Sequence, residues 1–144
     1  MLKTLGNNAD AVDPMRKAVT LSPDDAEAHY NLGVVLLQLG RPEEAETSFR
    51  RALELCTGYA DARLNLGVAL NQMRRMDEAE DCLREAVRIR PDSAAAHGNL
   101  GAVLDAQGRL DEAEASYRQA VAIRPDAAEG HFGLGRILRM RGCL

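Results

Sequence analysis

The most informative part of the sequence is residues 26–59, which read AEAHYNLGVVLLQLGRPEEAETSFRRALELCTGY. Apolar and small residues recur every three or four positions, which predicts a helix over about Glu27–Leu39. Gly40 is typical of a left-handed helix end. Pro42, followed by two glutamates, is typical of a second helix start, because acidic side chains there face the positive end of the helix dipole. The stretch therefore predicts two helices joined by a tight turn.

The same pattern recurs along the whole chain with a period of 34 residues. The positions in register are Leu32-Gly33, Leu66-Gly67, Leu100-Gly101 and Leu134-Gly135, then Ala45, Ala79 and Ala113, then Ala52, Ala86 and Ala120, and finally Phe49, Leu83 and Tyr117. Two further slots each contain an exception, with Thr57 beside Pro23, Pro91 and Pro125, and Arg74 beside Gly6, Gly40, Gly108 and Gly142. Asp92 and Asp126 follow two of these prolines and are expected to cap the next helix. Self-similarity of this length is the signature of a repeat architecture.

Small residues in the repeat indicate how its helices pack. Gly33 and Ala45 stand where the two antiparallel helices of one repeat should approach closely, and Ala52 stands where a neighbouring repeat packs. Leu36 and Phe49 then fill the space between the helices. One repeat cannot bury its apolar face alone, so repeats must stack. We therefore predict an all-α fold, a right-handed α-solenoid of helix-turn-helix repeats.

These slots resemble those of the tetratricopeptide repeat (TPR) family, whose period is 34 residues with Leu-Gly, Ala, Phe and Pro at fixed positions. The resemblance extends over nearly the whole chain. Within the family, the array resembles the TPR superhelix of O-linked N-acetylglucosamine transferases. The chain departs from the family at two slots. The Trp slot contains His29, Arg63, His97 and His131, and the Tyr slot of the first helix contains Leu36, Leu70, Leu104 and Leu138.

The phase of the repeats sets the expected boundaries. We predict a single TPR array over residues 1–144, with a partial repeat over 1–25 that is mainly a second helix, full repeats over 26–59, 60–93 and 94–127, and a lone first helix over 128–144. Residues 1–5 are expected to end one helix before Gly6, and Asp13-Pro14 to begin the next. Because the first and last repeats are partial in this register, we expect that the chain is either a fragment of a longer array or that a second copy of the chain completes these repeats.

Composition excludes several function classes. Eighteen Lys and Arg against 22 Asp and Glu give a formal charge of −4, and aromatic residues make up only 3% of the chain. A nucleic-acid binder would have a basic excess and exposed aromatics, so we expect no nucleic-acid partner. No apolar run approaches the roughly 20 residues of a membrane span, and the first residues do not resemble a signal peptide, so we expect no membrane insertion. Cys56, Cys82 and Cys143 are irregularly spaced, which favours free thiols and a cytoplasmic location.

In TPR arrays the first helix of each repeat lines a concave groove, so the resemblance implies a surface there that binds a protein or an extended peptide. At about 100° per residue, one stripe of each first helix lies away from its buried side. The candidate binding residues are Glu27, Tyr30, Asn31, Val34 and Gln38, then Asp61, Leu64, Asn65, Val68 and Gln72, then Asn99 and Arg136.

The asparagines at positions 31, 65 and 99 each belong to an Asn-Leu-Gly triplet. A side-chain amide there would pair with both the N–H and the C=O of one peptide unit in an extended ligand. Duplication of one ancestral repeat explains the same recurrence, so both readings stay open. Gly133 interrupts the series in the last repeat. The groove positions occupied by Tyr30, Leu64 and Gly98 contain no basic cluster, so we do not expect the carboxylate-binding mode of TPR co-chaperones.

The last helix suggests self-association. Leu134, Ile137, Leu138 and Met140 leave it apolar on more than one side, unlike the polar helix that usually caps a solenoid. Head-to-tail stacking of incomplete terminal repeats would build filaments or rings and make the chain a homo-oligomer. Local dimerisation, or simple exposure of these residues, is the alternative.

The sequence therefore predicts a non-catalytic scaffold that binds a peptide or protein segment in the groove. One alternative is a self-assembling structural array, and another is the substrate-targeting TPR region of a larger enzyme such as a glycosyltransferase. We predict no catalytic residue, cofactor or metal. His29, His97 and His131 occupy one repeat slot, and repeats are separated by roughly 10 Å or more, so these rings should not share a metal ion.

Overall fold

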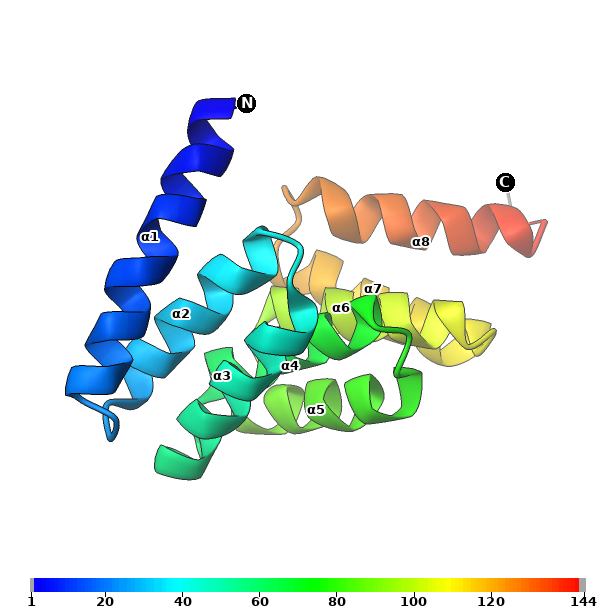
Figure 1. Ribbon diagram of the computed structural model, residues 1–144. Helices are drawn as coiled ribbons and strands as arrows, with labels where there is room; N and C mark the ends of the chain where they lie inside the picture. Colours follow the sequence, from blue (N-terminus) through cyan, green and yellow to red (C-terminus); the bar gives the residue numbers. More distant parts are fainter. Residues whose placement is uncertain (1, 143–144) are drawn as a thin grey trace. The chain divides into compact units, whose positions relative to one another are not determined.

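The computed structural model describes residues 2–142, with side chains from Ala11 onwards, and this part of the chain forms eight α-helices and no strand (Figure 1). The helices are α1 (Leu2–Leu21), α2 (Ala26–Gln38), α3 (Pro42–Leu55), α4 (Ala60–Gln72), α5 (Met76–Ile89), α6 (Ala94–Ala106), α7 (Leu110–Ile123) and α8 (Ala128–Met140). The predicted start of the second helix at Pro42 is confirmed, and the first helix ends within one residue of its predicted limit.

The first helix of each repeat ends in the left-handed turn that the sequence predicts. Gly40, Gly108 and Gly142 have φ values of 74°, 76° and 73°, a region that favours glycine. The Arg41 N–H donates to the Leu36 carbonyl at 2.9 Å and so closes the turn. Arg74 adopts the same geometry, with φ 62°, although it has a Cβ atom. The backbone is therefore set by the repeat rather than by the residue at this position.

The helix starts correct one prediction. Asp92 and Asp126 do not cap the following helices, because the N-cap lies one residue further along the chain. The Ser93 hydroxyl accepts a hydrogen bond from the Ala96 N–H at 3.1 Å, and in the same register Asp25 caps α2. The residue after each proline lies in the turn, too early in the chain to reach these N–H groups.

Helix α1 corrects a second prediction. The sequence predicts one helix ending before Gly6 and another beginning at Asp13-Pro14, whereas α1 is continuous over Leu2–Leu21 with Pro14 inside it. Proline removes only its own N–H from the hydrogen-bond ladder, so the turns on either side keep theirs. The local break signals at Gly6 and Pro14 therefore do not end the helix.

The chain divides into two compact units, Met1–Arg74 (unit 1) and Arg75–Leu144 (unit 2). In unit 1, α2 packs against α3, and α4 packs against both. Gly33 lies so close to Phe49 that an added Cβ would come within 2.6 Å of the ring, which explains the glycine in the predicted close approach. Ala45, Phe49 and Ala52 are fully buried, as the packing argument requires.

In unit 2, α7 packs between α6 and α8. The Tyr117 ring lies beside two glycines, and an added Cβ would come within 3.0 Å of the ring at Gly101 and 2.4 Å at Gly133. Gly133 interrupts the asparagine series, and the ring gives the steric reason, because no larger residue fits there. Ile137 of α8 completes the core with no exposed surface.

No helix of the described residues is long and apolar enough to span a membrane. Cys56 is exposed and Cys82 buried, and neither forms a disulfide in the described part of the chain. Cys143 lies outside the described residues.

Candidate functional site

In unit 1, the candidate residues lie on α2 and α4, which contact each other. Glu27, Asn31, Gln38, Asp61 and Gln72 are exposed, whereas Tyr30, Val34, Leu64, Asn65 and Val68 are half-buried. The structure brings Tyr30 and Asn65 together, since the Asn65 Nδ2 donates to the Tyr30 hydroxyl at 3.3 Å. The Tyr30 ring also lies 5.0 Å from the ring of Tyr59, which the sequence analysis missed because Tyr59 precedes α4.

Two carboxylates lie close to this pair of rings. Burial raises the pKa of Tyr30, the Asp61 carboxylate raises it further, and the hydrogen bond from Asn65 offsets part of the effect. Burial also raises the pKa of Tyr59, with smaller contributions from Tyr30, Glu27 and Asp61. Both phenols therefore stay neutral and keep a hydroxyl donor at physiological pH.

The asparagine amides are partly used within their own helices. The Asn65 Nδ2 donates to the Asp61 carbonyl at 2.9 Å, and the Asn99 Nδ2 donates to the Ala95 carbonyl at 2.9 Å. Because Asn65 also donates to Tyr30, both of its N–H groups have partners and only Oδ1 remains for a ligand. Asn99 keeps one N–H and its Oδ1. Pairing with both groups of a peptide unit is thus open to Asn99 but not to Asn65.

Unit 2 contains a groove of about 430 Å³ beside Asn99. Helix α6 contributes Ala94, Ala95, Gly98, Asn99 and Ala102. Helix α7 contributes Tyr117 and Ala120, and α8 contributes Glu129 and Gly130. The cap residues Arg124, after α7, and Ala127, before α8, complete the wall. Small side chains therefore form most of its wall, and polar groups lie among them. Concave, mostly apolar sites with a few polar groups are typical of ligand-binding sites.

A second groove of about 390 Å³ lies along α8. It is lined by Tyr117, Ala128, Glu129, Phe132, Gly133 and Arg136. The Arg136 guanidinium, expected to bind a ligand, instead donates to the Asp105 carboxylate at 2.5 Å. Phe132 is 77% exposed, and the sequence analysis did not name it. Its register could have identified it, since it lies one period after Gly98 in the slot that also contains Tyr30 and Leu64.

The four residues predicted for self-association differ in exposure. Ile137 is fully buried within its own unit, so its side chain does not reach a second copy while α8 stays packed. Leu134 and Leu138 are half-buried. Met140 is 57% exposed. The exposed apolar surface of α8 therefore centres on Phe132 and Met140.

The histidine slot has a structural partner. His29, His97 and His131 each place Nε2 within 2.6–2.9 Å of the carbonyl oxygen of the proline six residues earlier. Arg63 occupies this slot in the one repeat where Thr57 replaces that proline, so the two exceptions in the sequence occur together. Within the described part of the chain, no group of three His, Cys, Asp or Glu side chains is placed to hold a metal ion.

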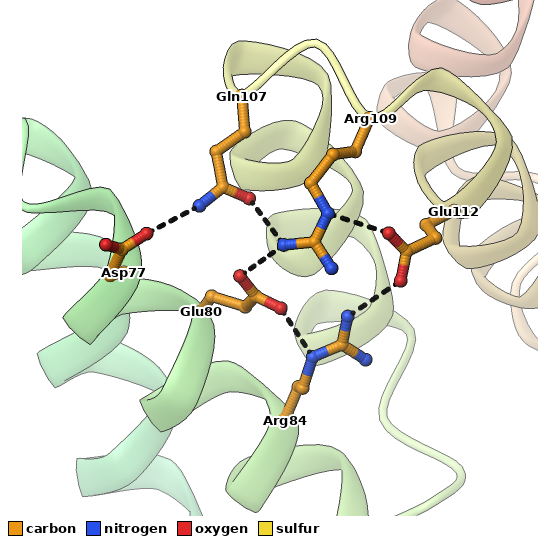
Figure 2. A network of polar contacts seen from close by, with 6 residues as sticks. All are labelled: Asp77, Glu80, Arg84, Gln107, Arg109 and Glu112. Atoms are coloured by element: carbon orange, nitrogen blue, oxygen red, sulfur yellow. Dashed lines mark hydrogen bonds and ion pairs between the residues drawn. The ribbon is translucent and has the colours of Figure 1, made fainter.

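Charged side chains of α5, of α7 and of Arg109, the N-cap residue of α7, form a connected network that the sequence analysis also missed (Figure 2). Glu80 accepts from Arg84 at 2.8 Å and from Arg109 at 2.6 Å. Glu112 accepts from the same two arginines, at 3.2 Å and 2.7 Å. Arginine recurs at positions 41, 75 and 109, with a glutamate three residues later each time, and this spacing was the available signal.

Comparison with known families identifies the repeat. A tetratricopeptide repeat model matches residues 24–92 and 58–126, and a second TPR model matches residues 1–40. The chain belongs to the tetratricopeptide repeat family. No curated protein matches the sequence significantly.

Solved TPR structures share the fold. The crystal structure of MamA superposes with a TM-score of 0.88 at 26% identity, over 98% of this chain and 82% of that one. Pseudomonas aeruginosa pilF gives 0.86 at 26% identity, over 95% and 63%. The first TPR of Spaghetti (RPAP3), bound to the HSP90 peptide SRMEEVD, gives 0.79 at 20% identity, over 81% and 93%. The predicted fold class, an all-α solenoid of TPR repeats, is confirmed.

TPR proteins are protein-interaction modules, and the chain is a scaffold of this class.

Proposed function

We propose that the chain binds an extended peptide or protein segment along the first helices of its repeats, with the 430 Å³ groove of unit 2 as the principal contact. The observation that supports this proposal most directly is the position of Asn99 on the groove wall. Its amide keeps one N–H and the Oδ1, which match the carbonyl and amide of a peptide backbone. Contact through the backbone would tolerate many ligand sequences.

Unit 1 offers a candidate contact surface of its own. The exposed Glu27 and Asn31 lie on the same helix as Tyr30, whose ring and hydroxyl are half-buried beside Asn65. Aromatic side chains that are partly buried and keep a solvent-exposed polar end are well suited to contact with a peptide ligand. The RPAP3 repeat shows that this fold can hold a peptide.

Fluorescence anisotropy with a labelled peptide library tests the proposal. Replacing Asn65 and Asn99 together by Ala should weaken binding at least tenfold, because the ligand backbone loses the N–H and Oδ1 of Asn99 and the Oδ1 of Asn65. Gln119→Ala is the matched control, since Gln119 is an exposed amide of α7 that lines neither groove. Unchanged binding in the double variant would remove the asparagines from the site, and failure of every peptide to bind would remove the groove function itself.

Self-association is a second candidate, favoured by the exposure of Phe132 and Met140 on α8. Phe132 is 77% exposed to solvent, and covering this apolar ring with a second copy of the chain would favour association. Mass in solution as a function of concentration distinguishes this candidate from a monomeric peptide-binding scaffold. The third alternative, a targeting region of a larger enzyme, stays a prediction.

A further inference from the structure

The groove of unit 2 exists because one repeat lacks a large side chain. Gly98 occupies the slot that contains Tyr30, Leu64 and Phe132 in the other repeats. A Cβ added at Gly98 would meet only the Ala120 Cβ, at 4.0 Å, so the backbone alone does not require glycine. The missing side chain leaves an apolar space, and an apolar group of a ligand would gain by filling it.

The groove also contains a cation without a partner. In the part of unit 2 that the structure describes, the Arg124 guanidinium has no hydrogen bond or ion pair, although Arg124 lines the groove. Arg84, Arg109 and Arg118 of the same unit are all paired with glutamates. A partnerless guanidinium beside a groove favours an anionic ligand.

The start of α8 adds to this positive potential. Its N-cap residue, Ala127, lines the groove and has no side chain that could accept from the first N–H groups of the helix. Asp25 and Ser93 supply such acceptors at the starts of α2 and α6. The free N–H groups carry the positive end of the helix dipole. Glu129 is the one acidic residue of the groove wall and opposes part of this potential.

We propose, on the basis of the peptide-binding function above, that the groove recognises a large apolar side chain next to an aspartate or glutamate in the ligand. The apolar side chain occupies the space beside Gly98 and Ala120. The neighbouring carboxylate pairs with Arg124 and with the N–H groups at the start of α8. The oxygen and remaining N–H of Asn99 contact the backbone between them. A basic ligand residue in the same place would face the Arg124 guanidinium and is disfavoured.

Gly98→Leu tests the apolar part of the proposal. The leucine should fill the groove, and because leucine has a higher helix propensity than glycine, the fold should not be weakened. Gly135→Leu is the matched control, since a Cβ at Gly135 meets nothing within 4 Å and Gly135 lines neither groove. The probe is a pool of randomised hexapeptides with acetylated and amidated ends, so that every ligand carboxylate belongs to a side chain. The wild-type chain and Gly135→Leu should enrich peptides with Leu, Met or Phe beside an acid, and Gly98→Leu should lose this enrichment.

Arg124→Ala tests the charged part. Individual peptides from the enriched pool should bind this variant about tenfold more weakly, whereas their Asp→Asn versions should bind wild type and variant equally. Arg139→Ala is the control, because Arg139 is exposed on α8 and lines neither groove. Glu129→Gln should tighten binding of the acidic peptides by removing the opposing charge, and added salt should weaken it.

The outcomes separate this inference from the function on which it rests. Enrichment of basic or small residues, or an unchanged preference in Gly98→Leu, would overturn the inference while peptide binding stood. If Arg124→Ala weakens the binding of acidic peptides and of their Asp→Asn versions equally, the proposed pairing of a ligand carboxylate with Arg124 would be overturned. Absence of any enriched peptide for the wild-type chain would overturn the proposed function and this inference together.

Discussion

Glycine has opposite roles at two positions of the Leu-Gly slot. A Cβ at Gly33 would come within 2.6 Å of the Phe49 ring, whereas one at Gly135 meets nothing within 4 Å. We expect Gly33→Ala to lower the free energy of unfolding by about 1–3 kcal/mol, because the ring is fully buried and has little room to move. Gly135→Ala should raise it by about 0.5–1 kcal/mol, because glycine in the middle of a helix is less favourable than alanine. Urea denaturation followed by circular dichroism measures both, and equal effects would contradict the assigned close approach.

Arg74 is strained by its backbone position. Its φ of 62° places a Cβ in the left-handed region, where three glycines occupy the equivalent turns. We expect Arg74→Gly to raise the free energy of unfolding by about 0.5–1 kcal/mol, the relief of strain being partly offset by the greater freedom of glycine in the unfolded chain. Gly40→Arg, at φ 74°, is the reciprocal control and should destabilise. If Arg74→Gly instead lowers the free energy of unfolding in the same urea measurement, the contacts of the Arg74 side chain stabilise the protein by more than its left-handed backbone conformation destabilises it.

At the scale of elements, the network of Figure 2 joins Glu80 of α5 to Arg109, the N-cap residue of α7. The Glu80 side chain is 14% exposed and accepts from both Arg84 and Arg109. We expect Glu80→Gln to lower the free energy of unfolding by about 1 kcal/mol, more than an isolated surface pair contributes. Glu54→Gln is the control, because Glu54 pairs only within α3 and is 66% exposed. If thermal unfolding shows the same loss of stability for Glu80→Gln and Glu54→Gln, the ion pairs of the network act as independent surface pairs.

The ion pairs of Glu80 also predict how the stability of the protein depends on pH. Burial raises the pKa of Glu80, but the hydrogen bonds from Arg84 and Arg109 lower it more, so it lies below the ordinary value of 4.5. The carboxylate therefore contributes stability that is complete above the unfolded-state pKa and is lost as pH falls through the lower folded-state pKa. The difference in stability between wild type and Glu80→Gln should shrink below about pH 4.5. A difference that stays constant down to pH 3 would contradict the ion pairing.

At the scale of the whole molecule, the self-association that the sequence predicts can be tested at the exposed apolar side chains of α8. Phe132 is 77% and Met140 57% exposed. If they mediate association, light scattering after size exclusion should give a mass that rises with concentration under reducing conditions. Replacing both residues by Ser should return the mass to that of one chain, while Leu21→Ser, which alters an exposed leucine of α1, should not. A constant monomer mass for the wild type would exclude this role.

The 34-residue period in the sequence determined the helix pairs, the left-handed turns and the small residues at close approaches, because each is a local requirement that every repeat must meet. Predictions made from single local signals were less successful. Gly6 and Pro14 did not break α1, and Asp92 did not cap α6, because the register of the neighbouring turns decided both.

Only the tertiary structure decided which candidate residues have free groups. Asn65 has given both N–H groups to Tyr30 and Asp61, and Arg136 is bonded to Asp105, whereas Arg124 remains without a partner beside the groove. The sequence places Asn65 and Arg136 on their helices but does not reveal that Tyr30 and Asp105, which belong to other helices, are partners of their side chains. The groove beside Gly98 likewise needs α6, α7 and α8 together, because a missing side chain makes a cavity only where its neighbours surround the space.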